Sequence, residues 1–119
     1  MFSLEGFKKY VHRGRANTPK VTIRKAGQIG FNSGAIGKYN LDVYKYAMLF
    51  ISDDKKRVAV KFTNNEKESG VLAIQKRPGS FAFSAIPFMR LHDISYDKTR
   101  NFDFTWIEKD KVAIFRPEE

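Results

Sequence analysis

The sequence predicts a strand-rich α+β protein in which two pseudo-symmetric halves, each built from strands, a short helix and a hairpin, form one barrel-like core. Three observations predict this class. Apolar and polar residues alternate in several short runs, as in strands. In two segments the apolar residues recur at the spacing of a helix. The order of these patterns repeats from the middle of the chain. With 119 residues, 42% of them hydrophobic, the chain is long enough for one packed domain, which we assign to residues 21–119.

The first half, residues 21–63, begins with a β-hairpin whose turn contains Gly27. Residues 33–40 are expected to form a short helix with Ser33 as its N-cap. Residues 44–52 are apolar on both faces and predict a central strand, and a further strand returns after a polar turn. The alternating apolar residues of this half are Val21, Ile23, Ile29, Phe31, Val58, Val60 and Phe62.

A polar linker, residues 64–70, leads to residues 72–117, where the same signals recur. A second helix is expected within residues 84–94, capped by Ser84 and with Phe88 and Leu91 facing inward. The halves match at offsets of 51 for the first strand, 52 for the glycine turn and second strand, and 54 for the last strand. An internal duplication therefore predicts two superposable halves with both helices on the same side of the core. The matched residues include Val21 and Leu72, Gly27 and Gly79, Ile36 and Phe88, Tyr39 and Leu91, and Val58 and Val112.

Residues 21–41 contain a basic strand, a glycine turn, two apolar strand positions, a short helix and an exit at Tyr39-Asn40-Leu41. This order resembles the swapped-hairpin DNA-binding domains of the AbrB, MazE and MraZ group. The resemblance covers residues 21–63 and, more faintly, residues 72–117. It implies that one chain supplies both halves of a barrel that most relatives build from two chains, as in the MraZ-type tandem arrangement.

The chain departs from the family pattern at three places. The family's usual proline is replaced, no arginine follows either turn glycine, and glycines stand in the first helix where the family has paired basic residues. The residues at these departures are Asn32 and Ser84, Gln28 and Ser80, and Gly34 and Gly37.

The formal charge of +9, with a pI near 9.9, predicts a polyanionic partner, and nucleic acid before an anionic membrane. Residues 1–20 carry +4, residues 21–70 carry +4 and residues 71–119 carry +1. Residues 1–20 are expected to form a basic arm with a short helix. Lys and Arg beside a hairpin turn reach phosphate oxygens, an amide beside them can read a base edge, and the resemblance implies DNA contacts from the same places. The candidate nucleic-acid-binding residues are Arg13, Arg15, Arg24, Lys25, Gln28, Lys38, Lys76, Arg77 and Arg90.

No enzyme, metal site or cofactor is expected. Cysteine is absent, His12 and His92 lie far apart, and the Asp53-Asp54 pair is typical of a polar turn. The longest uncharged apolar stretch, residues 46–51, is too short to cross a bilayer. We therefore expect a cytoplasmic transcriptional regulator that binds double-stranded DNA, with no membrane partner.

A second copy of the chain or a regulatory protein is the further partner expected. Two alternatives stay open at this point. One is a single-stranded-DNA-binding module of the Whirly or coactivator type, and the other is a protein-interaction module whose basic surface has no nucleic-acid role. The first alternative needs a stacking platform, for which the candidates are Tyr39, Tyr44, Tyr46, Phe81 and Phe83.

Overall fold

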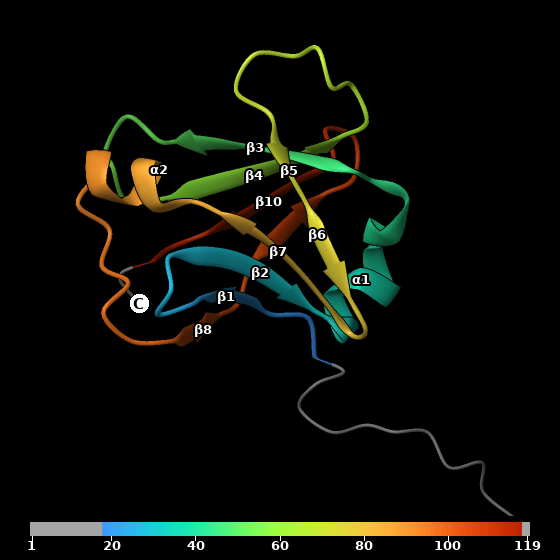
Figure 1. Cartoon of the computed structure of the whole chain (residues 1–119), viewed down its shortest axis with the longest axis horizontal. Coiled ribbons are helices and arrows are strands. Elements are labelled where there is room, and N and C mark those ends of the chain that lie inside the picture. Colours follow the sequence, from blue (N-terminus) through green and yellow to red (C-terminus); the bar gives the residue numbers. More distant parts are fainter. Residues whose placement is uncertain (1–17, 118–119) are drawn as a thin grey trace, which may run out of the picture.

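Two five-stranded antiparallel sheets and two short helices form the body of the protein (Figure 1). The computed structural model describes residues 18–117. The strand-rich α+β class predicted from the sequence is confirmed. In chain order the elements are β1 (Val21–Ile23), β2 (Gln28–Asn32), α1 (Ser33–Tyr39), the 3₁₀ helix η2 (Leu41–Val43), β3 (Tyr46–Ile51), β4 (Val58–Thr63), β5 (Leu72–Ala73), β6 (Gln75–Arg77), β7 (Ser80–Ser84), α2 (Ile86–Leu91), β8 (Arg100–Phe102), β9 (Thr105–Ile107) and β10 (Val112–Phe115).

Each half of the sequence contributes strands to both sheets. Sheet A has the order β6-β7-β2-β1-β8, and sheet B has the order β5-β3-β4-β10-β9. Only Ile74 separates β5 in sheet B from β6 in sheet A, and only Asp103 and Phe104 separate β8 in sheet A from β9 in sheet B. These two segments therefore run directly from one sheet to the other.

The core lies between the inner faces of the two sheets, because successive strand residues point to opposite faces. The apolar residues that alternate along β1, β2, β4 and β7 are buried on this side. The ring of Phe31 in β2 meets Phe62 of β4 edge-on, with centroids 5.2 Å apart, and Phe104 with centroids 5.5 Å apart. Phe31 thus joins sheet A to sheet B.

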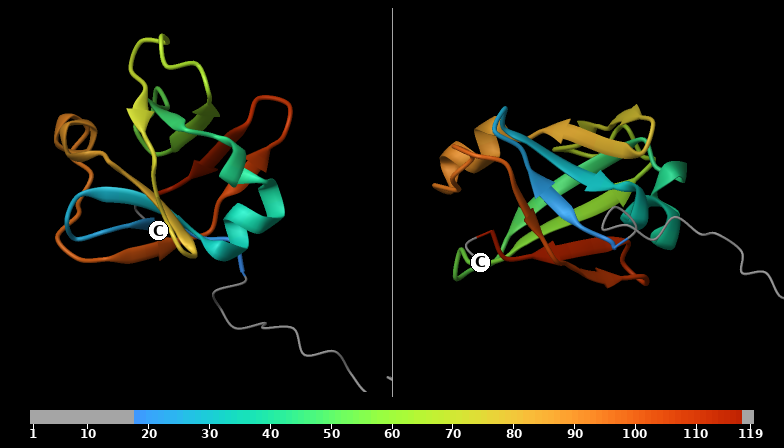
Figure 2. Two further views of the ribbon diagram at one scale, coloured as in Figure 1. Left: turned by 45° about the vertical axis from the view of Figure 1, so that its right-hand side comes forward. Right: turned by 90° about the horizontal axis from the view of Figure 1, so that it is seen from below.

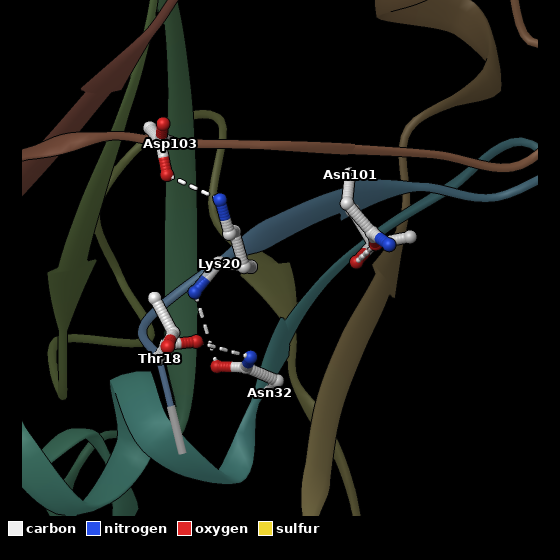
Figure 3. Close-up of polar contacts among 6 residues, drawn as sticks. Thr18, Lys20, Asn32, Asn101 and Asp103 are labelled. Carbon is white, nitrogen blue, oxygen red and sulfur yellow. Dashed lines mark hydrogen bonds and ion pairs between the residues drawn. The ribbon is translucent and has the colours of Figure 1, made fainter. Parts of the chain in front are cut away.

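Helix α1 begins one residue after its cap, and that cap is Asn32 rather than the predicted Ser33. Asn32 still has the extended backbone of β2, which is the conformation that an N-cap requires. Its side-chain oxygen accepts from the backbone N–H of Ala35 at 3.0 Å and of Lys20 at 3.1 Å (Figure 3). Its amide group donates to the carbonyl oxygen of Thr18 at 2.7 Å. One side chain therefore fixes both the helix start and the irregular segment that precedes β1.

Replacing Asn32 with Ala is expected to lower the free energy of unfolding by about 1–2 kcal/mol, because the helix loses its cap and the N–H of Lys20 loses its acceptor. Urea unfolding followed by circular dichroism measures this cost. Ser33→Ala leaves the cap of α1 in place and is expected to cost less than Asn32→Ala. A larger loss for Ser33→Ala would contradict the assignment of the cap.

Helix α2 is shorter than the sequence predicts. Ser84 pairs with Gln28 as the last residue of β7, so the strand continues through the expected cap, and Ala85 precedes the helix. Met89 is the buried residue of α2, whereas Leu91, which was expected to face inward, is 76% exposed.

The two helices lie at opposite ends of the molecule, not on the same side of the core as expected (Figures 1 and 2). The reason is visible in the pairing of β2 with β7. These strands are antiparallel, and each leads directly into its helix, so the two helices begin at opposite ends of the pair.

Candidate nucleic-acid interface

Acidic residues are absent from two long segments of the described chain. All ten Asp and Glu of residues 18–117 lie within residues 42–68 and 93–110, whereas residues 18–41 and 69–92 have none. The acid-free segments build β1, β2, β6 and β7 together with both helices, and β8 also lacks a carboxylate. Sheet A is therefore a sheet without acidic residues. The cationic residues of the two acid-free segments are Lys20, Arg24, Lys25, Lys38, Lys76, Arg77 and Arg90.

The pairing of β2 with β7 creates this surface, because it places the two acid-free segments side by side (Figure 1). The strands of sheet B also lack Asp and Glu, so the two sheets differ in their turns: the β3-β4 and β9-β10 turns of sheet B contain acidic residues, whereas the turns at residues 24–27 and 78–79 of sheet A contain none. The sequence alone shows that both segments lack Asp and Glu. Net charges summed over residues 1–20, 21–70 and 71–119 do not show it, because the two longer ranges each combine an acid-free segment with one that contains acidic residues.

The outer face of sheet A is made of small and polar side chains. At its centre Gly30 pairs with Ala82. Ala82 is buried, but it is not part of the hydrophobic core cluster. The hydroxyl of Thr22 donates to the side-chain oxygen of Asn101 at 2.6 Å across β1 and β8. The polar residues around this centre are Thr22, Gln28, Asn32, Gln75, Ser80, Ser84 and Asn101.

Arg24 lies across this face, over Gly30. A Cβ atom at Gly30 would lie 3.3 Å from Nη2 and 3.4 Å from Nε of Arg24, and 2.9 Å from the carbonyl oxygen of Phe81. The missing side chain of Gly30 therefore leaves the space that the guanidinium occupies. The backbone N–H of Arg24 donates to the carbonyl oxygen of Gln28 at 2.8 Å, which places Arg24 at the base of turn 1, residues 24–27.

Turn 1 and helix α2 form the first end of the candidate interface, which holds Arg24, Lys25, Gln28 and Arg90. The N–H of Ala85 donates to the carbonyl oxygen of Gly27 at 2.9 Å, and the N–H of Lys25 donates to the Thr99 hydroxyl at 3.2 Å. Nε of Arg90 donates to the Tyr96 hydroxyl at 3.1 Å. The first contact ties turn 1 to the start of α2, the second ties turn 1 to the segment between α2 and β8, and the third ties α2 to that same segment.

Two acidic residues lie near the first end. Asp93 follows α2, and its backbone N–H donates to the carbonyl oxygen of Arg90 at 3.4 Å. Lys25 lines a shallow pocket of about 390 Å³ together with Ser95, Tyr96 and Asp97. A hydrogen bond from the Ser95 hydroxyl lowers the pKa of Asp97, so this carboxylate stays ionised. Asp97 therefore partly offsets the positive charge of Lys25.

Turn 2, residues 78–79, and helix α1 form the second end, which holds Lys38, Lys76 and Arg77. Nζ of Lys76 donates to the carbonyl oxygen of Asp42 at 2.6 Å and lies 5.3 Å from the centroid of the Phe81 ring. Lys76 pairs with the core residue Phe81, so its side chain leaves the sheet on the side opposite to Arg77 and ties the second hairpin to the segment after α1. Nζ of Lys38 lies 5.6 Å from the centroid of the Tyr39 ring, and Arg77 is exposed at the end of β6.

The predicted binding residues thus fall at two ends of one sheet, each end combining a turn from one half with a helix from the other (Figure 1). Arg13 and Arg15 lie outside the described residues. The sequence interpretation missed the centre of the face, Gly30 and Ala82, and the polar residues on the outer strands, Thr22 and Asn101. Their side-chain types carry no binding signal by themselves.

Most aromatic candidates for a stacking platform belong to the core. Phe81 and Phe83 are 5% and 1% exposed, and Tyr39 and Tyr44 pack against the core cluster. Tyr39 stacks on Trp106 with centroids 5.2 Å apart. Base stacking needs exposed rings, so these four side chains do not support the single-strand alternative.

No helix within residues 18–117 is long and apolar enough to cross a membrane, and these residues contain no group of three or more His, Asp or Glu that could hold a metal ion. Comparison with family models, curated proteins and solved structures gives no match for this chain.

Proposed function

We propose that this protein binds double-stranded DNA through the outer face of sheet A and acts as a small transcriptional regulator. The observation that carries this proposal is the pair of hairpins β1-β2 and β6-β7 in sheet A, which lack acidic residues in their strands and turns and place arginines at both ends of the outer face. Arginine and lysine gain affinity for a duplex by neutralising phosphates and releasing counterions, and neighbouring carboxylates would oppose this.

We propose further that the two halves are tandem repeats around one barrel-like core, as in the swapped-hairpin group that the sequence resembles. The register of β2 with β7 supports the repeat. At the offset predicted for the second strand, Gly30 matches Ala82, and these two residues pair with each other. Gln28 pairs with Ser84, the match of Asn32, and Asn32 pairs with Ser80, the match of Gln28. If β2 and β7 are exchanged, the same set of residue pairs results, as expected for two strands related by a two-fold axis.

The register of β4 with β10 supports the same relation independently. At the offset predicted for the last strand, Val58 matches Val112 and Lys61 matches Phe115. Val58 pairs with Phe115, and Lys61 pairs with Val112. The segments that run from β5 into β6 and from β8 into β9 join the two sheets on both sides, which supports the barrel-like core.

The first strand of each half requires a different offset from the predicted one, which matched Val21 with Leu72. Thr22 pairs with Gly30 and Gln75 pairs with Ala82, so Thr22 matches Gln75. A shift of two positions keeps every side chain on its face, so apolar alternation cannot detect it. At the corrected offset Arg24 matches Arg77, and the two arginines are placed symmetrically about the Gly30–Ala82 pair.

Symmetric arginines suit a duplex, because its two antiparallel strands are themselves related by two-fold axes and protein symmetry is mirrored in a DNA site. From strand spacings, the two arginines are about 20 Å apart. Gln28 lies beside Arg24 on β2, where its amide is placed to read a base edge next to a phosphate contact.

The double variant Arg24→Ala, Arg77→Ala tests the proposal. If each arginine contacts one phosphate, the slope of log K against log salt is expected to become shallower by about 1.8 units, about 0.9 for each contact. Fluorescence anisotropy with a labelled random duplex, repeated at several salt concentrations, measures the slope.

The double variant Lys55→Ala, Lys56→Ala is the matched control, because it removes the same charge from the turn between β3 and β4 of sheet B. It is expected to change the slope much less. Equal slopes for the two double variants would contradict a specific role of sheet A. Tighter binding of the wild-type protein to the single strand of the same sequence would favour the single-strand alternative.

A further inference from the structure

A hollow of about 550 Å³ lies outside the candidate interface, where β8 of sheet A continues into β9 of sheet B. β8 pairs with β1 as far as Phe102, and β9 pairs with β10 from Thr105 onward. The two sheets part between these pairings, and residues 101–105 line one side of the hollow. A volume of this size is typical of sites for small molecules.

One wall of the hollow is apolar. Phe102 and Phe115 belong to different sheets, are almost fully buried, and have ring centroids 5.6 Å apart. Phe104 and Ile114 also line the hollow, but both are only half-buried. Part of their apolar surface is therefore exposed inside the hollow, where a ligand can cover it and gain the free energy of burial.

Two arginines line the side of the hollow that belongs to sheet B, Arg57 and Arg116. Val58 is the first residue of β4 and pairs with Phe115, so Arg57 and Arg116 come next to each other one step beyond this pair of antiparallel residues. Like charges on neighbouring strands repel each other, whereas an anion between two guanidinium groups is attracted to both. The arrangement therefore favours an anionic group at this side of the hollow.

Neither of the nearest carboxylates is ion-paired with Arg57. Asp54, in the turn before β4, accepts from the Ser52 hydroxyl at 2.5 Å and from the backbone N–H of Lys56 at 3.0 Å. Asp103 lines the hollow itself, but Nζ of Lys20 lies 2.5 Å from its carboxylate oxygen (Figure 3). The hollow thus keeps the positive charge of its two arginines.

A neutral donor lies on the opposite side, on β8. The side-chain oxygen of Asn101 accepts from the Thr22 hydroxyl at 2.6 Å, which leaves the amide NH₂ of Asn101 as a donor at the hollow. The hollow therefore combines an apolar wall, a neutral hydrogen-bond donor and two cations. These are the parts of a site that fixes the orientation of a small ligand.

We propose that this hollow binds a small organic anion, a phosphate or carboxylate that carries an apolar group. The anionic group lies between Arg57 and Arg116, and the apolar group packs on Phe104 and Ile114. Arginine suits both kinds of anion, because its planar fork of N–H donors matches a pair of oxygens. This inference does not depend on DNA binding, since the arginines of the proposed DNA contact, Arg24 and Arg77, do not line the hollow.

Amide chemical-shift titration of the full-length protein with 1-naphthyl phosphate tests the inference, with inorganic phosphate and 1-naphthol as separate probes of the two parts. We expect shifts to concentrate in residues 101–105 and 114–116. The naphthyl phosphate is expected to bind at least about tenfold more tightly than either smaller probe, because it alone uses both the arginines and the apolar wall.

Arg57→Gln is expected to weaken the binding of 1-naphthyl phosphate about tenfold, because one of the two charged donors is lost. Lys56→Gln is the matched control. It removes the same charge one residue away, from a side chain that does not line the hollow, and is expected to change the affinity less than about twofold. Arg57→Gln is expected to leave the salt slope of DNA binding unchanged, so the two proposals can fail separately.

Four results would overturn the inference. Failure of 1-naphthyl phosphate to bind would show that the hollow is no site for such anions. Equal affinity for inorganic phosphate would show that the apolar wall has no role. Equal losses in Arg57→Gln and Lys56→Gln would reduce the binding to general charge attraction. A loss in the Arg24→Ala, Arg77→Ala double variant as large as that in Arg57→Gln would place the anion on sheet A.

Discussion

Replacing Gly27 with Ala is expected to lower the free energy of unfolding by about 2–4 kcal/mol, the sum of a backbone cost and a steric cost. Gly27 has a φ of +87°, a left-handed backbone conformation that costs a residue with a Cβ about 1 kcal/mol or more. The added Cβ would also lie 2.2 Å from Cγ1 and 2.9 Å from Cδ1 of Ile86. Ile86 begins α2, so relieving the overlap requires the helix or its side chain to move, at a cost of about 1–3 kcal/mol.

Gly79→Ala is the matched control for the backbone cost. Gly79 precedes β7 as Gly27 precedes β2, and its φ is +76°, but a Cβ there would meet nothing within 4 Å. We expect Gly79→Ala to cost about 1 kcal/mol. Urea unfolding of the two variants then isolates the contact between turn 1 and α2. Similar costs for both would mean that turn 1 does not pack on the second helix.

The sequence predicted the local structure well where one pattern determines it. Alternating apolar residues predicted the strands of both hairpins, and those residues are buried in β1, β2, β4 and β7. The caps were predicted less well. Ser33 and Ser84 are good capping residues, but strands β2 and β7 extend to Asn32 and Ser84, and strand pairing decides where each helix begins.

Local sequence patterns could not predict how the strands divide between the two sheets. That division depends on pairings between residues far apart in the sequence, such as Gly30 with Ala82. The same limit applies to the candidate interface. Lys25, Arg77 and Arg90 were recognisable from their residue types and their places near turns. That Arg90 lies at the same end as Lys25 follows only from the contact of α2 with turn 1.

Replacing Phe31 with Ala is expected to lower the free energy of unfolding by about 3–5 kcal/mol, because a large side chain that is 2% exposed leaves a cavity that its neighbours fill only partly. Phe31 belongs to β2 of sheet A, and its ring touches Phe62 of β4 and Phe104 in the segment that leads into β9. The cavity therefore lies between the sheets.

Phe31→Leu keeps most of the apolar volume and is expected to cost about 1–1.5 kcal/mol. Leu91→Ala removes an exposed apolar side chain and is expected to stay within about 0.5 kcal/mol of the wild-type stability. Thermal and urea unfolding of the three variants give the comparison. Because sheet A carries the proposed DNA contacts and sheet B supports it through Phe31, a cost for Phe31→Ala no larger than that for Phe31→Leu would mean that sheet A is held in place by contacts other than this ring.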